Sequence, residues 1–351
     1  MSQSTLKTLS ALKDAALITE ADAERLRPVA DHYAISVTPF LANRIRDGAA
    51  DDPIARMFIP TEAELDRRPE ELNDPIGDES HTPVPGIVHR YPNRVLLKPV
   101  AVCPVYCRFC FRREMVGPEL GDALSPKALE AALDYIRAHP EIREVIMTGG
   151  DPFMLSAKRT KALTQAISDI PHVQILRWHT RMPVADPARI TPDYVDALTS
   201  TDKAVYVSVH INHIAELSDE TRAAARLMSK AGIALISQSV LLNGVNDDVE
   251  ALADLMEGLV AARIQPYYLH HPDLAPGTSH FRLSVERGQA LYQALRDRVT
   301  GLAVPRYVID IPGGVSKANA AGSDLTTLPD GRQALRGRDG KLYPYEEPSE
   351  D

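Results

Sequence analysis

The pattern of apolar and polar positions divides the chain near residue 86. Before residue 80, apolar residues recur with helical periodicity from Leu6 to Ala30, and polar stretches containing proline follow at residues 51–53 and 73–77. We interpret this part as a helical N-terminal segment packed on the main domain. Beyond residue 86, short apolar runs alternate with amphipathic stretches. This alternation predicts a second region made of strands and helices in turn.

The apolar runs predict six strands, over Val95–Ala101, Glu144–Met147, Gln174–Trp178, Ala204–His210, Ile233–Val240 and Ile264–Leu269. Helices are predicted over Ser125–Ala138, Ser156–Ile167, Pro192–Leu198, Asp219–Ala231, Asp248–Ala262 and Ser284–Val299. Successive strand–helix units require a parallel sheet with right-handed crossovers. We therefore predict an α/β protein with a partial (β/α)6 barrel, a six-unit relative of the TIM barrel. Its expected domains are a helical segment 1–80, the barrel 81–300 and a short C-terminal segment 301–351.

Five of the predicted strands end in polar side chains. These are Thr148–Asp151, His179–Arg181, His210, Gln238 and His270–Asp273. One polar residue at a strand end is more often a satisfied edge residue, but this explains five together poorly. Because functional residues of such barrels lie on the loops after the strands, the pattern predicts a site at that mouth.

Composition limits the class of protein further. The 351 residues are 44% hydrophobic and 25% charged, with 39 basic and 48 acidic residues and a net charge of −9. The basic residues form no cationic stripe, which argues against a nucleic-acid partner. There is no run of eighteen apolar residues and no N-terminal signal peptide, so we expect a cytoplasmic protein without a membrane partner.

All three cysteines lie in one short loop, as Cys103, Cys107 and Cys110. Three thiolates so spaced can each bind a different iron of a [4Fe–4S] cube, leaving the fourth iron open to another ligand. A zinc site completed by a histidine such as His89, or three buried thiols, are the alternatives. Zinc sites usually combine C-x2-C with a second, distant ligand pair, and only one such pair is present.

The spacing C-x3-C-x2-C, with Tyr106 and Phe109 directly before the last two cysteines, resembles that of the radical S-adenosylmethionine (SAM) superfamily. The resemblance implies that the open iron chelates the methionine end of SAM. Electron transfer into the sulfonium then releases a 5′-deoxyadenosyl radical.

About forty residues after the cysteines, Gly149, Gly150 and Asp151 precede a proline. They resemble the Gly-Gly-Glu-Pro element that holds the methionine amine in this superfamily, with aspartate in place of glutamate. Glycines let a backbone approach a ligand closely. His210 and Gln238 are further candidates for contacts with SAM.

Lys317 follows the glycine pair Gly313 and Gly314, which could carry its amine into a cavity. Lysines placed in this way form Schiff bases with pyridoxal phosphate (PLP). Composition alone favours a surface lysine in a loop, because lysine is rarely buried. Other parts of the sequence are needed to decide between these interpretations.

Several segments between about residues 80 and 320 resemble, in the same order, the lysine 2,3-aminomutase family. They are residues 89–94, 103–113, 149–151, 238–247, 266–270, 273, 280–282 and 310–317. The resemblance implies a radical SAM enzyme that also uses PLP and isomerises L-lysine to β-lysine.

The resemblance also assigns residues one by one. Lys317 matches the lysine that binds PLP covalently, and Arg90, Tyr91 and Arg94 match the segment that contacts its phosphate. Guanidinium groups suit that role because they bind phosphate oxygens bidentately.

Three further residues match contacts with the substrate. Arg112 matches the residue that binds the substrate carboxylate, and Asp273 and Asp310 match the pair that binds the ε-amine of lysine. Two carboxylates would compensate the charge of one ammonium group in a partly dry pocket.

The chain ends at Asp351 without the zinc-binding C-terminal extension of the long clostridial-type enzymes. It therefore resembles the short bacterial form that makes β-lysine for modification of elongation factor P, although Asp310 fits free-lysine mutases better. We expect a reductant such as flavodoxin or ferredoxin as partner, and a homo-oligomer. The alternatives are another amino-acid substrate such as glutamate or ornithine, an aminoacylated protein as substrate, a radical reaction without PLP, and a zinc-stabilised interaction module.

Overall fold

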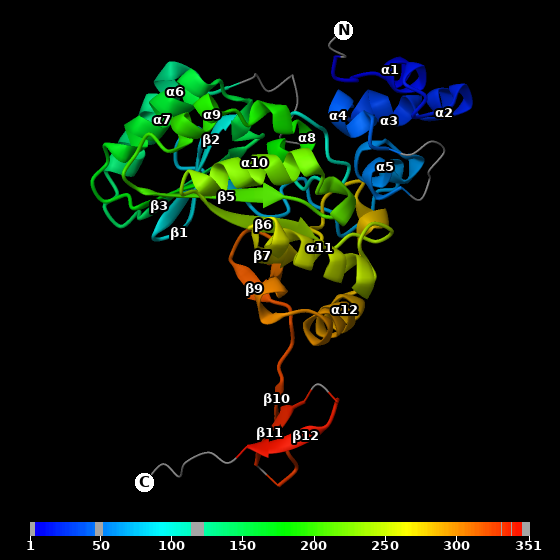
Figure 1. The fold of residues 1–351 in the computed structure, drawn as a ribbon. Coiled ribbons are helices and arrows are strands. Elements are labelled where there is room, and N and C mark those ends of the chain that lie inside the picture. Colours follow the sequence, from blue (N-terminus) through cyan, green and yellow to red (C-terminus); the bar gives the residue numbers. More distant parts are fainter. Residues whose placement is uncertain (1–3, 46–51, 114–122, 331, 338, 346–351) are drawn as a thin grey trace.

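A computed structural model describes residues 4–45, 52–113, 123–330, 332–337 and 339–345 of the protein (Figure 1). Its centre is a sheet whose nine strands follow one another in chain order. They are β1 Ile87–Tyr91, β2 Arg94–Val100, β3 Glu144–Gly149, β4 Ile175–Thr180, β5 Ala204–His210, β6 Ala234–Val240, β7 Gln265–His270, β8 Arg306–Asp310 and β9 Lys317–Asn319. Neighbours from β2 to β8 pair in parallel, whereas β1 and β9 pair antiparallel at the two edges.

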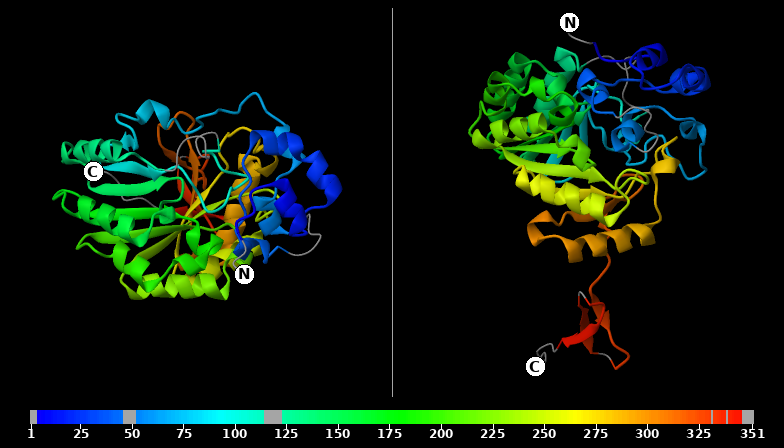
Figure 2. Two further views of the ribbon diagram at one scale, coloured as in Figure 1. Left: turned by 90° about the horizontal axis from the view of Figure 1, so that it is seen from above. Right: turned by 45° about the vertical axis from the view of Figure 1, so that its right-hand side comes forward.

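Helices connect the parallel strands and cover the outside of the sheet (Figures 1 and 2). They are α6 Pro126–Arg137, α7 Ala157–Ser168, α8 Met182–Ala185, α9 Pro192–Leu198, α10 Asp219–Lys230, α11 Val249–Ala261 and α12 Val285–Arg298. Serine, threonine or aspartate caps the N-terminus of each of the six longer helices. In α6, for example, the Ser125 side chain accepts a hydrogen bond from the backbone N–H of Ala128. The structure contains each of the six predicted helices, with both ends within one residue of the prediction. Strands β1 and β9 do not pair with each other among the described residues, so the barrel is open. The prediction of a partial α/β barrel is confirmed.

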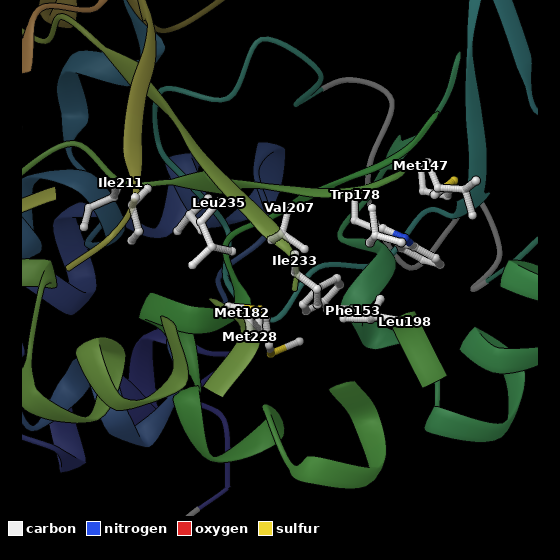
Figure 3. Packing of buried hydrophobic residues seen from close by; sticks show 14 of the residues in the cluster. Met147, Phe153, Trp178, Met182, Leu198, Val207, Ile211, Met228, Ile233 and Leu235 are labelled. Carbon is white, nitrogen blue, oxygen red and sulfur yellow. The ribbon is translucent and has the colours of Figure 1, made fainter. Parts of the chain in front are cut away.

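The main core lies between the outer face of the sheet and these helices. Figure 3 shows Trp178 of β4 and Val207 of β5 facing Phe153, Met182 and the helices beyond them. Trp178 and Phe153 are fully buried, and their ring centroids lie 6.1 Å apart. Since the outward side chains of the strands form this core, the alternate side chains face the interior of the barrel.

The sheet has more strands than the sequence predicts. The six predicted strands correspond to β2–β7, and the structure adds β8 as a seventh parallel strand with β1 and β9 at the edges. The added strands are short, with five residues or fewer, so the chain pattern marks them weakly. The sheet therefore continues past residue 300 and reaches Lys317.

The N-terminal segment contains α1 Leu9–Asp14, α2 Glu20–Arg25, α3 Arg27–His32, α4 Pro39–Ala42 and α5 Pro53–Phe58. Its apolar side chains form a second core with residues of the barrel loops, including Val105 of the cysteine loop and Phe281. These short helices lie beside the barrel in both views of Figure 2. The segment therefore packs directly on the loop that carries the cysteines.

A three-stranded antiparallel sheet follows the barrel near the C-terminus. Its strands are β10 Leu325–Thr327, β11 Gln333–Arg336 and β12 Leu342–Tyr345, and it extends away from the barrel (Figure 1). Within the described residues, no helix has both the length and the apolar character needed to span a membrane.

Candidate active site

Every residue that the sequence assigns to the site lines one cavity of about 520 Å³. It is lined by Arg90, Tyr91, Arg94, Cys103, Cys107, Cys110, Arg112, Gly149, Gly150, Asp151, His210, Gln238, Asp273, Asp310 and Lys317. These residues come from strands and loops spread over more than two hundred positions of the chain. The barrel therefore brings all of them to one place.

The N-terminal segment holds the cysteine loop, which follows β2. The backbone N–H of Tyr106 donates to the carbonyl of Ser36 at 2.9 Å, and that of Arg108 donates to Met57 at 2.9 Å. Across the loop, the N–H of Cys110 donates to the carbonyl of Cys107 at 3.1 Å. The loop conformation thus depends on contacts outside the barrel.

The three cysteine side chains line the cavity and are partly buried. Burial raises the pKa of each thiol, and it raises that of Cys107 to about 12. Two positive charges oppose this effect: the charge of Arg181 lowers the pKa of Cys107, and that of Arg112 lowers the pKa of Cys110. Metal binding deprotonates such thiols, and nearby guanidinium groups offset the negative charge of a thiolate-bound cluster. In the described part of the chain, no three His, Cys, Asp or Glu side chains are grouped to hold a single metal ion. A four-iron cube does not require such a group, because its three cysteine ligands each bind a different iron.

Glu64 is a residue of this site that the sequence does not reveal. It is fully buried, accepts hydrogen bonds from Arg108 Nε at 2.9 and 3.0 Å, and accepts one from Arg113 Nη2 at 2.5 Å. Both arginines flank Cys110. One carboxylate of the N-terminal segment thus compensates two buried cations of the cysteine loop.

The glycine pair serves the packing of two loops. A Cβ on Gly149 would lie 2.8 Å from the carbonyl oxygen of Val100, and one on Gly150 would clash with that of Val102. Gly149 also has a positive φ of 102°. The two glycines therefore allow the loop after β3 to lie against the start of the cysteine loop.

Asp151 is occupied by hydrogen bonds within the protein. Its Oδ1 accepts from Thr180 Oγ1 at 2.7 Å and from the N–H of Phe153 at 2.9 Å, and its Oδ2 accepts from the N–H of Arg181 at 2.7 Å. The carboxylate thus ties the loop after β3 to the end of β4. Its predicted contact with the SAM amine stays a prediction.

His210 and Gln238 are neighbours across the parallel pair β5–β6. Burial lowers the pKa of His210 to about 3, so its imidazole is neutral at pH 7. His179 lies beside it, with ring centroids 5.8 Å apart, and its Nε2 is buried without a hydrogen-bond partner within the described chain. These side chains offer neutral donors and acceptors to a ligand in the cavity.

Arg90, Tyr91 and Arg94 lie at the turn between β1 and β2. The Arg94 guanidinium lies 3.7 Å from the centroid of the Tyr91 ring, and the Tyr91 hydroxyl accepts a hydrogen bond of 3.2 Å from the backbone N–H of Lys317. Two further arginines, Arg177 and Arg306, line the same cavity. This concentration of guanidinium groups suits an anion such as a phosphate.

Lys317, the first residue of β9, forms an ion pair with Asp310, the last residue of β8. Its Nζ lies 2.6 and 2.7 Å from the two carboxylate oxygens. His270 Nδ1 lies 3.2 Å from Asp310 Oδ2. Burial opposes ionisation of Asp310, but the hydrogen bond with His270 and the charge of Lys317 prevail and hold its pKa well below the usual range.

Asp273 differs from Asp310 in its electrostatics. Burial, followed by the charge of Asp310, raises the pKa of Asp273 to about 7. No ion pair of Asp273 is found among the described residues. A second cavity of about 740 Å³ also borders Asp273 and Asp310. The pair therefore lies at the boundary between the two cavities, with Asp310 paired to Lys317 and no ion pair of Asp273 among the described residues.

Arg112 lines the same cavity, two residues after Cys110, and its Nε donates a hydrogen bond of 2.9 Å to Asp78. Asp78 and His270 join Glu64 as polar residues that the sequence-based site omits. His270 ends a predicted strand and could have been included on that ground. Glu64 and Asp78 lie in the N-terminal segment, where the sequence has no periodic pattern to single them out.

Comparison with known proteins defines the class. Residues 97–256 match the family model described as the Radical SAM superfamily, a region that includes all three cysteines and the glycine pair. This region is therefore similar to the radical SAM superfamily, in which a [4Fe–4S] cluster and SAM are the cofactors.

Longer matches narrow the class. L-lysine 2,3-aminomutase of Clostridium subterminale is 35% identical over 343 residues, which cover 98% of this chain and 82% of that protein. L-lysine 2,3-aminomutase of Escherichia coli is 36% identical over 285 residues, with 81% and 82% covered. Glutamate 2,3-aminomutase of Clostridioides difficile is 33% identical over 336 residues, with 95% and 79% covered. The chain belongs to the lysine 2,3-aminomutase family of radical SAM enzymes, which confirms the resemblance seen in the sequence.

Proposed function

We propose that this protein is a PLP-dependent 2,3-aminomutase that converts L-lysine to β-lysine. The observation that carries the proposal is the charge distribution in one cavity. Arg112 offers a cation near the cysteines, whereas Asp273 and Asp310 offer two carboxylates next to Lys317. A lysine molecule has the complementary charges at its two ends.

In this proposal, Cys103, Cys107 and Cys110 hold the [4Fe–4S] cluster. When bound beside the cluster, SAM would supply the radical chemistry that removes hydrogen from the β-carbon of the substrate. The SAM contacts assigned to this chain are Gly149, Gly150, Asp151, His210 and Gln238. The three cysteines and these five residues line one cavity, and this proximity supports the assignment.

Lys317 is proposed to hold PLP covalently, with Arg90, Tyr91 and Arg94 around the phosphate. PLP supplies a ring that delocalises the unpaired electron while the amino group moves from the α-carbon to the β-carbon. The Tyr91 hydroxyl contacts the backbone of Lys317 and Arg94 stacks on the Tyr91 ring. These contacts join the proposed phosphate site to the proposed attachment site.

The substrate is oriented by its charges. Arg112 binds the α-carboxylate, and Asp273 and Asp310 bind the ε-ammonium group. Two carboxylates for one ammonium group repel the side chain of glutamate, so the pair favours lysine although one relative is named for glutamate. Fixing both ends places the β-carbon in one position, as hydrogen transfer over a short distance requires.

Lys317 must leave Asp310 before that carboxylate can bind the substrate. The ion pair between them uses both carboxylate oxygens. If Lys317 held PLP covalently, its Nζ would no longer be an ammonium partner of Asp310, and that carboxylate would be free to bind the substrate. His270, which contacts Oδ2 of Asp310, remains to orient it.

Anaerobic reconstitution with iron, sulfide and PLP tests the proposal. With a reductant and SAM, we expect β-lysine from L-lysine and at least 10-fold slower turnover of glutamate and ornithine. Preferred turnover of glutamate would contradict the substrate assignment. Turnover that does not depend on PLP would contradict the cofactor assignment. Iron and sulfide content measured beforehand verifies that the cluster is loaded.

A further inference from the structure

Asp78 is a buried carboxylate that contacts three cations. It is 1% exposed and lies directly before the 3-10 turn Glu79–His81. Its Oδ1 accepts a hydrogen bond from Arg90 Nη2, and its Oδ2 accepts one from Arg112 Nε at 2.9 Å. The Lys98 ammonium group lies 3.7 Å from Oδ2. Burial opposes ionisation of Asp78, but the charges of Arg112, Lys98 and Arg90 prevail and hold its pKa at about 2.

The two arginines remain able to bind a ligand. Asp78 uses only one edge of each guanidinium, and both side chains line the 520 Å³ cavity. Across the described chain, the two Nη groups of Arg112 and the Nε of Arg90 donate no hydrogen bond to protein. A guanidinium held at one edge presents its other N–H groups in a fixed direction. This arrangement is preorganised for anions.

The turn that carries Asp78 is itself fixed. The carboxylate of Asp74 accepts hydrogen bonds from the backbone N–H groups of Asp78 at 2.9 Å and of Glu79 at 2.8 Å. The carbonyl of Pro75 accepts one of 3.1 Å from the N–H of Gly313, in the loop before Lys317. The turn that carries Asp78 therefore joins β1, the cysteine loop and the loop of Lys317.

We propose that Asp78 is a positioning residue that orients Arg90 and Arg112 together, and so links the site for the cofactor phosphate to the site for the substrate carboxylate. The identity of these anions rests on the proposed function. None of the residues that the sequence assigned to the site lies in the N-terminal segment, whereas Glu64 and Asp78 do. Asp78 makes that segment part of the active site.

A negative charge beside two anion sites has two opposite effects. It repels the bound anions, and it orients the cations that bind them. If repulsion were the larger effect, Asp78→Asn would tighten anion binding. If orientation is the larger effect, the variant binds anions more weakly, because an amide cannot accept hydrogen bonds from two guanidinium groups as the carboxylate does.

The test compares wild type, Asp78→Asn, Asp78→Glu and the control Glu79→Gln, all with the cluster reconstituted. Glu79 is the neighbouring acid on the same turn, and it is exposed. Equilibrium titration with PLP should give a Kd about 10-fold higher for Asp78→Asn, equivalent to about 1.4 kcal/mol. The KM for lysine should also rise about 10-fold, since one lost charge-assisted hydrogen bond has this magnitude. We expect a smaller loss in Asp78→Glu and none in Glu79→Gln. Pyridoxal, which lacks the phosphate, should lose less affinity than PLP.

Unchanged or tighter binding of PLP by Asp78→Asn would overturn the inference, provided that iron content and circular dichroism match wild type. Absence of PLP binding by wild type would instead reject the proposed function. A second measurement needs no PLP, and it can be made on Asp78→Glu, with a smaller expected effect, if Asp78→Asn does not fold. Modification by phenylglyoxal, located by mass spectrometry, should be several-fold faster at Arg90 and Arg112 in the variant. Equal rates in variant and wild type would also overturn it.

Discussion

The ammonium group of Lys317 lies 2.6 Å from Oδ1 and 2.7 Å from Oδ2 of Asp310. Asp310 is also the proposed partner of the substrate ε-ammonium, so the protein's own lysine occupies the substrate's place in this state. The two cations compete for one carboxylate. Their competition predicts an order of events in which PLP binds before lysine.

The order can be measured by lysine binding to protein without PLP. Removing the competitor in Lys317→Ala should tighten lysine binding about 10-fold, within the range for one hydrogen bond to a charged group. Isothermal titration calorimetry measures both affinities. Asp310→Asn should weaken lysine binding in both backgrounds. Equal affinity of wild type and Lys317→Ala would show that the ion pair does not obstruct the site.

Lys317→Ala should also abolish covalent attachment of PLP. We expect loss of the violet absorbance band of lysine-bound PLP and a fall in β-lysine formation by about 1000-fold or more, because a covalent step is removed. Lys230→Ala, at the exposed end of α10, is the matched control and should keep the band. A persistent band in Lys317→Ala would assign PLP to another lysine.

The pKa of Asp273 near 7 predicts pH dependence of lysine binding. Only the ionised carboxylate attracts the ammonium group, so affinity should rise as the pH rises through 7. From pH 6 to pH 8 the ionised fraction of such a group grows about 10-fold, and KM should fall by a similar factor. Asp273→Asn should flatten this profile. An identical slope in the variant would assign the dependence to another group.

The raised pKa of Asp273 also affects the stability of the fold, which should fall as the pH rises. A carboxyl group whose folded pKa is raised above its unfolded value favours the folded state at low pH, and this contribution is lost as the pH rises through the folded value. As the pH rises from about 4 to 7, the contribution of Asp273 to the free energy of unfolding should therefore fall. Urea denaturation of Asp273→Asn should show a smaller loss of stability over this pH range than wild type. An equal loss would contradict the assignment of a raised pKa to Asp273.

Substitution of any one cysteine should remove the cluster. The chain has only Cys103, Cys107 and Cys110, so no other thiol can replace a lost ligand. Each single change to serine should lower iron and sulfide content to background and stop reductive cleavage of SAM. Circular dichroism serves as the control for folding. Zinc in place of iron and sulfide after anaerobic purification would contradict the cluster itself.

Glu64→Gln should destabilise the protein strongly. Its removal leaves Arg108 and Arg113 buried without their carboxylate, and breaking a buried pair costs about 3–5 kcal/mol. Urea or thermal denaturation measures this loss. Glu62→Gln, whose side chain is 54% exposed, should change stability by less than about 1 kcal/mol. Equal stability of the two variants would show that the Glu64 cluster does not support the cysteine loop.

The barrel strands and helices could be predicted because each has its own period and its own caps. The pattern of α6 is complete within one stretch from the Ser125 cap to Arg137, so local sequence defines it. Strands β8 and β9 are short and border the sheet edge, where neighbouring strands rather than local sequence decide their pairing. For this reason, six parallel strands were predicted and the described residues form seven.

By itself, the sequence determined the class of chemistry and the residues of the cavity. The cysteine spacing, the polar strand ends and Lys317 are local features, and all of them meet in the structure because the ends of parallel strands share one edge. The tertiary structure alone decided which charges meet. The ion pairs of Glu64 with Arg108, of Asp78 with Arg112 and of Lys317 with Asp310 depend on through-space distance and burial, which no spacing along the chain records.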